Sequence, residues 1–487
     1  MSDLKLYKLN EAYIKFECER SLAQELSDYF TFFVPGHQFT PAFKSRVWDG
    51  KIRLADLRNF TIYHGLVPYI EKFCKDRDYT IDIDPSISTT ENYSLVEANE
   101  FITSLKLPYE VRDYQLKAFV NAVRSKRMLL LSPTASGKSL IIYLVIRYLL
   151  EAGYKRGLLI VPNISLVAQM YKDFEDYGWE SSDYCHTIHG GKDKQANKFL
   201  FISTWQSIYT QPKEYFDQFE FVIGDEAHQF KAKSMTTIMT GCDSAKYRIG
   251  TTGTLDGTQT HRLVLEGLFG PVFQSTSTSE LIEQGHVADF NIKCLILKYP
   301  EPVCKESKKW DYQAEIDYIV SNPKRNEFIK NLVLSLTGNT LVLFQLVERH
   351  GKILYQLIKE HAKNRHVFFV YGGTDVEVRE SVRAITEKEP DAIIVASYGV
   401  YSTGVNIRNL HNIVFASPSK SRIRNLQSIG RGLRLGDNKD KATLLDISDD
   451  FRTGKHTNYT LKHFVERVKI YDEEKFNYKF YNIEMKT

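Results

Sequence analysis

The sequence has few cysteines, and they do not form the patterns of a disulfide framework or a zinc module. Only six occur in 487 residues, and no two of them form a C-x-x-C pair. Scattered cysteines of this kind favour reduced thiols in a compartment like the cytosol. We therefore expect a cytoplasmic protein that holds no structural zinc.

Long apolar runs are also missing. No stretch reaches the length of about 20 apolar residues that a membrane-crossing helix needs. The first residues, MSDLKLYKLNEAY, lack the apolar core of a signal peptide. No repeat period or low-complexity tract stands out. The sequence thus predicts a globular protein without a membrane partner.

Neither sign of charge dominates the chain. The formal net charge is +4, and apolar and charged residues make up 43% and 25% of the sequence, as in ordinary globular proteins. A mild basic excess permits nucleic-acid binding but does not argue for it, so any basic surface has to be local.

Changes in the pattern of apolar and polar residues divide the chain into several domains. Residues 1–95 read as a small α+β domain that ends in a polar, acidic linker, DIDPSISTTENYS. Beyond Leu107, short apolar runs alternate with helical patterns, which is typical of buried parallel strands with crossover helices. The expected strands are 128–131, 157–161, 199–203, 220–224 and 247–250, then 340–344, 366–371, 392–397, 412–416 and 443–447. We expect two successive parallel α/β domains, 96–300 and 301–455, and a short helical extension, 456–487.

The segment SPTASGKS (132–139) lies between an apolar strand and an apolar helix and has the spacing of a Walker A loop, with Ser132 in place of the first Gly. In such a loop, backbone N–H groups cradle phosphates, Lys138 reaches the β- and γ-phosphates, and Ser139 holds Mg²⁺. The alternative is a Gly-Lys-Ser turn that merely starts a helix. If Ser132 and Ala135 obstruct the phosphates, affinity for ATP will be low. The residues predicted to hold the nucleotide here are Thr134, Ala135, Ser136, Gly137, Lys138 and Ser139.

A second motif, FVIGDEAHQF (221–230), places two carboxylates directly after an apolar strand. In a P-loop enzyme, Asp225 would hold Mg²⁺ through water and Glu226 would orient the attacking water. His228 either couples the nucleotide site to neighbouring loops or is a satisfied polar residue. The alternative is an ordinary solvated acidic turn, which the presence of both motifs disfavours.

Together with further motifs in order, these segments resemble the superfamily 2 helicases and translocases. VRDYQ (111–115) resembles the motif that reads adenine, with Arg112 and Gln115 in the matching places. The other matches are LLIVPNISLVAQ (158–169), HGG (189–191), STWQS (203–207), TTGTL (251–255), VASYGVYSTGVNI (395–407) and QSIGRGLR (427–434). The resemblance implies two tandem RecA-like domains that bind ATP and Mg²⁺.

The same resemblance assigns roles in the second α/β domain and in coupling. Arg434 becomes the arginine finger and Arg431 a γ-phosphate contact, although their segment also reads as a solvated, charged helix face. The residues that it implies for coupling are His228, Thr252, Thr254 and Gln427.

In this superfamily the nucleic-acid strand is held mainly through its phosphates, so we expect binding that is independent of sequence and weakened by salt. A plain turn or cap role is an equal alternative for each residue that the resemblance marks for such contacts. These residues are Gly190, Gly191, Thr204, Gln206, Ser207, Ser402 and Thr403.

The stretch FKSRVWDGKIRLADLRNF (43–60) interleaves cations with aromatic residues, which suits a duplex or a fork arm. The alternative is an amphipathic hairpin that turns at Asp49-Gly50 and holds Trp48 in its core. The candidate contacts are Lys44, Arg46, Trp48, Lys51 and Arg53. A second basic run, SPSKSRIRN (417–425), either touches DNA or caps the domain surface.

The resemblance is strongest to the UvsW-type helicases of T-even phages and includes FTPAFKSRVWDGKIRL (39–54). It implies an ATP-dependent DNA helicase that remodels forks, four-way junctions and R-loops in recombination, repair and replication. It also implies a monomer in the host-cell cytoplasm, with RNA as a partner in RNA–DNA hybrids. The alternatives are an RNA helicase, a nucleotide-gated DNA clamp and the motor subunit of a restriction complex.

Overall fold

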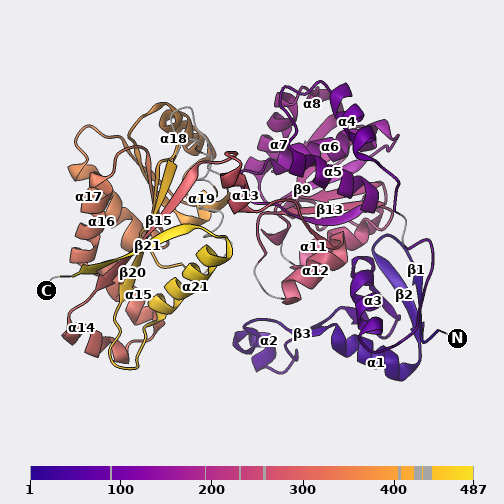
Figure 1. Ribbon diagram of the computed structural model, residues 1–487, viewed down its shortest axis with the longest axis horizontal. Helices are drawn as coiled ribbons and strands as arrows, with labels where there is room; N and C mark the ends of the chain where they lie inside the picture. Colours follow the sequence, from indigo (N-terminus) through magenta and orange to yellow (C-terminus); the bar gives the residue numbers. More distant parts are fainter. Residues whose placement is uncertain are drawn as a thin grey trace. The chain divides into compact units, whose positions relative to one another are not determined.

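The computed structural model describes residues 2–87, 90–191, 193–229, 232–255, 259–403, 407, 409–419, 421, 430 and 441–485, without the side chains at 232, 259–261, 376 and 401–403. The chain forms two compact units (Figure 1). The first comprises Met1–Ser132 and Gly137–Thr276, and the second comprises Pro133–Ser136 and Ser277–Thr487.

The first unit begins with the expected α+β domain. Its sheet has the order β5-β6-β2-β1-β7, and a separate two-stranded sheet joins β3 to β4. Alternate residues of β1 and β2 are buried, and they form one apolar core with α1 and α3. The elements are β1 (Leu4–Lys8), β2 (Tyr13–Cys18), α1 (Arg20–Tyr29), β3 (Thr31–Phe33), η1 (His37–Phe39), α2 (Pro41–Lys44), β4 (Lys51–Arg53), β5 (Ala55–Asp56), β6 (Thr61–Tyr63), η2 (His64–Leu66), α3 (Val67–Lys75) and β7 (Ile81–Ile83).

The rest of the first unit is an α/β domain around a parallel sheet of order β10-β11-β9-β12-β13-β8-β14. Neighbouring residues of one strand enter different cores: Met128 and Leu130 pack with α5, α6 and α7, whereas Leu129 packs with α11 and α12. Burial on both faces explains why these strands read as continuous apolar runs.

The strands of this sheet are β8 (Arg127–Leu131), β9 (Gly157–Val161), β10 (Cys185–Ile188), β11 (Leu200–Thr204), β12 (Phe221–Gly224), β13 (Tyr247–Thr252) and β14 (Val272–Gln274). The helices around it are α4 (Leu95–Ser104), α5 (Asp113–Ser125), α6 (Lys138–Glu151), α7 (Ile164–Asp176), α8 (Ser181–Tyr184), α9 (Trp205–Ile208), α10 (Lys213–Phe216), η3 (Ala227–Gln229), α11 (Ala232–Gly241) and α12 (Gln259–Phe269).

The second unit contains another parallel sheet, of order β17-β18-β16-β19-β20-β15-β21. Its strands are β15 (Asp289–Lys298), β16 (Thr340–Phe344), β17 (Val367–Val370), β18 (Ile393–Ser397), β19 (Asn412–Phe415), β20 (Lys441–Asp450) and β21 (Asn477–Glu484). Its helical segments are α13 (Thr278–Glu283), α14 (Glu301–Glu306), η4 (Ser307–Lys309), α15 (Tyr312–Ser321), α16 (Pro323–Ser335), η5 (Val347–Gly351), α17 (Lys352–His361), α18 (Val376–Lys388), α19 (Tyr398–Thr403) and α21 (Tyr459–Glu473).

The fold class predicted from sequence is confirmed, with differences in detail, among them the unpredicted edge strands β10 and β14 of the first parallel sheet. Strand β15 pairs with β20 and β21 in the second sheet, so the predicted boundary at residue 300 falls too late for this strand. The extension beyond residue 456 contains the expected helix, α21, and then also strand β21 at the edge of the sheet. Both strands are partly exposed, and β21 mostly so, which removes the continuous apolar run that marked the other strands.

A buried ion pair fixes the carboxy-terminal helix to the second sheet. The guanidinium group of Arg467, on α21, donates to both carboxylate oxygens of Asp446, on β20, at 2.7–3.1 Å. Tyr471 Oη donates to the same carboxylate at 2.8 Å, and Arg467 also reaches the backbone oxygen of Ser419 at 3.0 Å. The Asp446 charge raises the pKa of Arg467 further above its usual range despite burial.

Among the described residues, no helix is long and apolar enough to cross a membrane.

We predict that Arg467→Ala destabilises the second unit strongly, because it leaves the Asp446 carboxylate buried without its cation. Breaking a buried pair from one side costs about 3–5 kcal/mol. Denaturant unfolding followed by intrinsic fluorescence should show a lower midpoint. Lys469→Ala, on the same helix, is the matched control: its ion pair with Glu466 is exposed and is worth about 0–1 kcal/mol. Equal midpoints for the two variants would contradict this role of Arg467.

Candidate nucleotide and nucleic-acid site

The loop from Ser132 to Ser139 joins the carboxyl end of β8 to the first residue of α6, as the motif requires. Gly137 has φ +76°, and a Cβ atom there would lie 2.4 Å from Nε2 of Gln115. Ala135 has φ +70°, a left-handed conformation that is strained for a residue with a side chain. The loop therefore keeps the backbone course of a glycine-rich loop although one glycine is replaced.

The replacement at Ser132 is accommodated by burial. The Ser132 side chain is fully buried, and its Oγ accepts a hydrogen bond from Ser275 Oγ at 3.0 Å. Its backbone N–H donates to the backbone oxygen of Thr252 at 3.0 Å. The hydroxyl thus has a partner in a neighbouring loop of the same unit.

Two side chains that the motif predicts to touch the nucleotide lie at the start of α6. Lys138 Nζ donates to the backbone oxygen of Ser132 at 3.2 Å and lies 3.7 Å from Oε1 of Glu226. Ser139 Oγ is 2.9 Å from Oη of Tyr177, at the end of α7. The structure thus brings the Walker lysine to the second motif.

Asp225 follows β12 directly and is almost fully buried. Its Oδ1 accepts a hydrogen bond from Thr251 Oγ1, on β13, at 2.5 Å. Burial raises the pKa of Asp225, the neighbouring charge of Glu226 raises it further, and Lys138 and Thr251 oppose both effects. Two adjacent carboxylates at the end of a parallel strand, with partial compensation by one lysine, fit a Mg²⁺ ion that arrives with nucleotide phosphates.

The second motif is also joined to the end of β13. His228 Nδ1 lies 2.6 Å from Thr252 Oγ1 and 3.4 Å from Oε2 of Glu226. Because Thr252 Oγ1 already donates to the backbone oxygen of Thr254 at 2.7 Å, it accepts from His228, which assigns the proton to Nδ1. Thr254 therefore enters this network through its backbone, whose carbonyl accepts from Thr252 Oγ1 and whose N–H donates to it at 3.3 Å. The structure brings three of the predicted coupling residues together; Gln427 lies outside the described residues.

Gln115, which the resemblance assigns to adenine, is buried beside the loop. Its Oε1 accepts from the backbone N–H of Arg112 at 3.0 Å, and its Nε2 lies close to Gly137. Arg112 Nη1 donates to Tyr114 Oη at 3.0 Å. These contacts give Gln115 a structural role in closing the start of α5 onto the loop, and its contact with adenine stays a prediction.

The predicted phosphate contacts of the first unit are of two kinds. Thr204 Oγ1 and Ser207 Oγ hydrogen-bond each other at 2.8 Å within the local turn, and Gln206 Nε2 donates at 3.1 Å to the backbone oxygen of Pro162, just after β9. Gly190 and Gly191 have φ of +57° and +85°, and a Cβ atom at either would meet open space. Their conformation, rather than packing, calls for glycine.

The predicted contacts of the second α/β domain cannot be placed in the same way. Ser402 and Thr403 lie in α19, but their side chains are outside the described part of the chain, as are Arg431 and Arg434. The same holds for most of the basic run at 417–425. Their roles stay predictions.

Residues 31–53, here named the arm, form an antiparallel hairpin of β3 and β4 that carries η1 and α2 between the strands (Figure 1). Trp48 is half-buried and its Nε1 donates to the backbone oxygen of Lys51 at 2.9 Å. Arg53 pairs with Asp49 at 2.5 Å, and Lys51 Nζ lies 4.9 Å from the centre of the Phe33 ring. The segment is thus part of a hairpin, as the alternative expected, but residues 34–50 join its strands instead of a turn at Asp49-Gly50, and Trp48 is not in a core.

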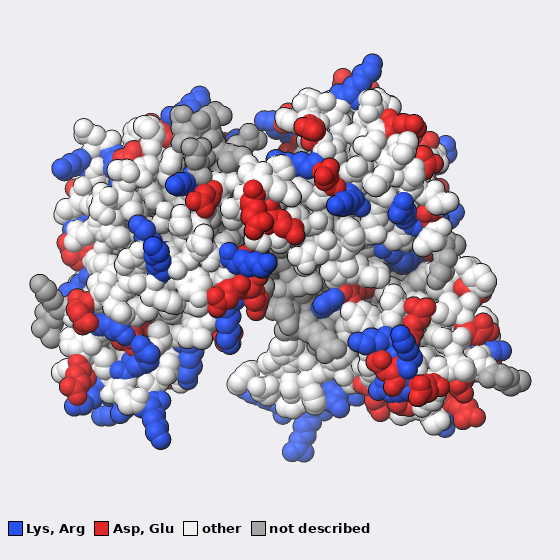
Figure 2. Space-filling model, viewed as in Figure 1, with Lys and Arg blue, Asp and Glu red and all other residues white. Residues whose placement is uncertain are grey.

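The exposed part of the arm is different from the part that sequence reasoning emphasised. Lys44 and Arg46 are exposed. Phe39 and Val47, which were missed, are 73% and 84% exposed. Figure 2 shows the arm, below the centre of the view, as a mostly uncharged surface bordered by basic side chains. The sequence feature that could have predicted this exposed surface is the occurrence of apolar residues in a segment rich in turn-forming Pro, Gly and Asp.

Three families match successive parts of the chain. Residues 3–84 match the family described as DNA helicase UvsW, N-terminal; residues 108–257 match the Type III restriction enzyme res subunit; and residues 324–436 match the helicase conserved C-terminal domain. The ATP-dependent DNA helicase uvsW of Enterobacteria phage T4 is 37% identical over 98% of both chains. The chain belongs to the UvsW family of helicases.

Solved structures agree with this membership. The crystal structure of T4 UvsW has a TM-score of 0.54 and 34% identity, and the match covers 99% of this chain and 100% of that one. The DNA 3'-5' translocase XPB2 of Sulfurisphaera tokodaii is 28% identical over 44% of this chain and 47% of its own length. As a member of the UvsW family, the chain is an ATP-dependent helicase that acts on nucleic acid.

We predict that Thr252→Val lowers unwinding more than ATP hydrolysis, because it removes the acceptor that holds His228 beside Glu226. A buried donor left without a partner costs about 1–3 kcal/mol, so we expect roughly a tenfold loss of base pairs opened per ATP. Coupled measurement of strand displacement and phosphate release checks this ratio.

Thr254→Val is the matched control for this prediction. Thr254 Oγ1 is buried and makes no hydrogen bond within the described residues, and only its carbonyl group accepts from Thr252. The ratio should therefore stay near that of the wild type. A similar loss in both variants would show that the Thr252–His228 contact is not what links the two activities.

Proposed function

We propose that this UvsW-family helicase is an ATP-driven DNA translocase that unwinds and branch-migrates forks, four-way junctions and R-loops in recombination, repair and replication. The observation that carries the proposal is the 37% identity with the T4 DNA helicase along 98% of both chains, which includes the amino-terminal domain and its arm. The proposed domain limits are those of the sequence analysis, with β15 moved to the second α/β domain.

The proposed chemistry begins with nucleotide phosphates on the loop 132–139, where Lys138 would contact the β- and γ-phosphates. Bound Mg²⁺, held by Ser139 and through water by Asp225, would neutralise charge on the transferring phosphoryl group. Glu226 would orient the attacking water and accept its proton. His228 Nδ1 hydrogen-bonds Thr252 and lies 3.4 Å from Glu226 Oε2, so the proposed proton acceptor is adjacent to the end of β13.

Arg434 and Arg431 would complete this site from the second α/β domain, with Arg434 as the finger. Such a residue is worth about 10³–10⁵ in rate. Loss of the γ-phosphate after hydrolysis then removes the contacts that favour a closed arrangement of the two α/β domains. Movement along the strand requires that the nucleotide states grip it differently, since equal binding shifts nothing.

The strand would be held through phosphates by Gly190, Gly191 and the Thr204–Ser207 turn, with Ser402 and Thr403 on the second domain. The exposed N–H groups of two glycines in left-handed conformation suit an anionic oxygen. Such contacts read no bases, so we propose binding to DNA of any sequence, and to RNA in hybrids, by a monomer.

The arm would contact a duplex or a branch point. Lys44 and Arg46 are exposed and suit phosphates, whereas Phe39 and Val47 offer an apolar surface for bases at an open end. Trp48 would act indirectly, by holding the hairpin through its bond to Lys51.

The first experiment measures ATP hydrolysis and strand displacement without nucleic acid and with single-stranded DNA, single-stranded RNA, a fork and a four-way junction. We predict strong stimulation by DNA and displacement on the branched substrates. Lys138→Ala should lose both by at least about 10²-fold, because phosphate positioning and charge stabilisation depend on it. Stimulation by RNA alone would favour an RNA helicase, and tight DNA binding without hydrolysis would favour a clamp.

A second experiment tests the arm through the salt dependence of duplex binding. Each phosphate contact contributes about 0.9 to the slope of log K against log salt concentration. We predict that Lys44→Ala with Arg46→Ala reduces the slope by about 1.8 for two lost contacts. Lys15→Ala, an exposed cation on β2 outside the arm, should leave it unchanged. An unaltered slope in the double variant would remove the arm from the binding surface.

A further inference from the structure

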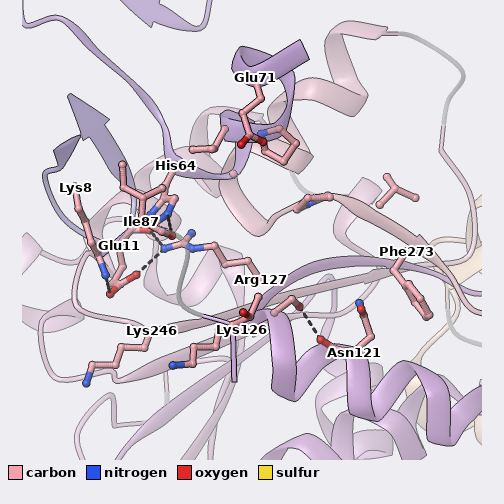
Figure 3. A pocket seen from close by; sticks show the side chains of 17 residues that line it. Lys8, Glu11, His64, Glu71, Ile87, Asn121, Lys126, Arg127, Lys246 and Phe273 are labelled. Carbon is pink, nitrogen blue, oxygen red and sulfur yellow. Dashed lines mark hydrogen bonds and ion pairs between the residues drawn. The ribbon is translucent and has the colours of Figure 1, made fainter. Parts of the chain in front are cut away.

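The first unit contains a cavity of about 530 Å³ between the amino-terminal domain and the amino end of β8 (Figure 3). We name it the β8 cavity. Its volume lies within the range of about 300–1,000 Å³ that is usual for small-molecule sites. The loop 132–139 follows the opposite, carboxyl end of β8, so this cavity is separate from the candidate ATP site. The chemistry of its wall is set by Lys8, Glu11, His64, Glu71, Lys126, Arg127 and Lys246.

Arg127, the first residue of β8, is partly buried at this cavity and uses only part of its guanidinium group. Its Nη2 donates to the backbone oxygen of Glu11 and to Glu11 Oε2, the latter at 2.7 Å. Its Nη1 is buried and has no hydrogen-bond partner within the described residues. A buried cationic donor in this state is costly unless an acceptor enters the cavity.

His64 presents the complementary group. It is 5% exposed, and its Nε2 lies 3.2 Å from the backbone oxygen of Ile87, which can only accept, so Nε2 carries the proton. Nδ1 is then an acceptor, and it is buried without a donor among the described residues. Burial, and after it the charge of Arg127, lowers the pKa of His64 to about 3, which keeps the ring neutral.

The remaining lining favours an anion with an apolar part. Lys8 and Lys126 are paired with Glu11 and Glu91, at 2.6 Å and 2.9 Å, whereas Lys246 is exposed at the rim. Glu71 adds one negative charge at the other side of the cavity in Figure 3. The apolar wall consists of Val67, Pro68, Ile87, Pro271, Val272 and Phe273.

We propose that the β8 cavity binds a nucleoside phosphate, with the phosphoryl group at Arg127 and Lys246 and the nucleoside along the apolar wall. An amino or hydroxyl group of the nucleoside would donate to His64 Nδ1. A planar base beside Phe273 and a multiply charged phosphate beside two cations account together for the donor, the acceptor and the apolar surface. The source is either a free nucleotide or the terminal nucleotide of a strand, which share this chemistry.

Binding of ADP to the full chain, measured by calorimetry and by equilibrium dialysis in the Lys138→Ala background, tests the proposal. That background weakens the candidate ATP site, so ADP that remains bound reports the β8 cavity. We expect binding that is weakened about tenfold or more by Lys246→Glu and by Arg127→Lys, because each loses a charge-assisted contact. Arg127→Lys keeps a cation for Glu11, and the exposed Lys246 keeps the test valid if the buried substitution does not fold.

Lys117→Glu, an exposed residue of α5 outside the cavity, is the matched control and should bind ADP as the parent does. Displacement of ADP by a 5′-phosphorylated trinucleotide would identify a strand end as the ligand, and its failure a free nucleotide; both support the site. Absence of residual ADP binding, or equal loss in Lys117→Glu, would overturn it. DNA-stimulated ATP hydrolysis of the wild type is measured in parallel, so failure here is distinct from failure of the proposed function.

Discussion

The burial of Asp225 beside Glu226 is the constraint on which the nucleotide site depends. A carboxylate in this position is stable only where donors and cations surround it. Strand register supplies the donor: β12 and β13 pair with Gly224 opposite Gly250, so the next residue of β13, Thr251, stands beside Asp225. Gly250 itself serves the packing on the other side of this strand, since a Cβ atom there would lie 2.8 Å from the Phe269 ring and 2.9 Å from the Leu129 side chain.

The same register places the residues proposed for nucleotide chemistry next to those proposed for coupling. Thr251 and Thr252 are adjacent on β13, yet Thr251 serves Asp225 and Thr252 serves His228. The Glu226 carboxylate lies between Lys138 and His228. Its Oε1 is 3.7 Å from Lys138 Nζ, and its Oε2 is 3.4 Å from His228 Nδ1. In the proposed mechanism, a change in the phosphates at Lys138 would alter the balance of charge on Glu226, which lies beside His228 and the end of β13.

The strands and site residues that could be predicted from the sequence were those whose pattern lies within a few neighbouring residues. Central strands were predicted because burial on both faces gives an apolar run, and the two motifs because each occupies one strand end. Strands β15 and β21 were missed because their partly exposed faces break that run. Trp48 was ambiguous because its sequence neighbours suit a hairpin and a binding surface alike. The β8 cavity could not be predicted, because the residues that line it are far apart in the sequence: Glu11, His64, Arg127 and Lys246 are examples.

The packing of the amino-terminal domain against the ATP-binding domain determines which part of the chain carries the arm. A Cβ atom on Gly65, in η2, would lie 2.0 Å from the backbone oxygen of Glu266, and one on Gly267 would lie 2.9 Å from the Tyr63 ring. The absence of a side chain at both positions therefore lets the two segments pack closely, and packed interiors deform little. Glu91, in the segment expected to be a linker, also contacts this domain, since its backbone N–H donates to the backbone oxygen of Arg124 at 2.9 Å.

The arm is consequently carried by the domain that holds Lys138 and Asp225, rather than by a flexible tether. Two further contacts act in the same direction: Arg127 of β8 holds the backbone and side chain of Glu11, and Lys126 pairs with Glu91 at 2.9 Å. A tether would let the arm lag behind any motion of the ATP-binding domain and dissipate its force. The arm, Lys138 and Asp225 belong to one compact unit, so a branch point bound by the arm, as proposed above, would follow the displacements of that unit.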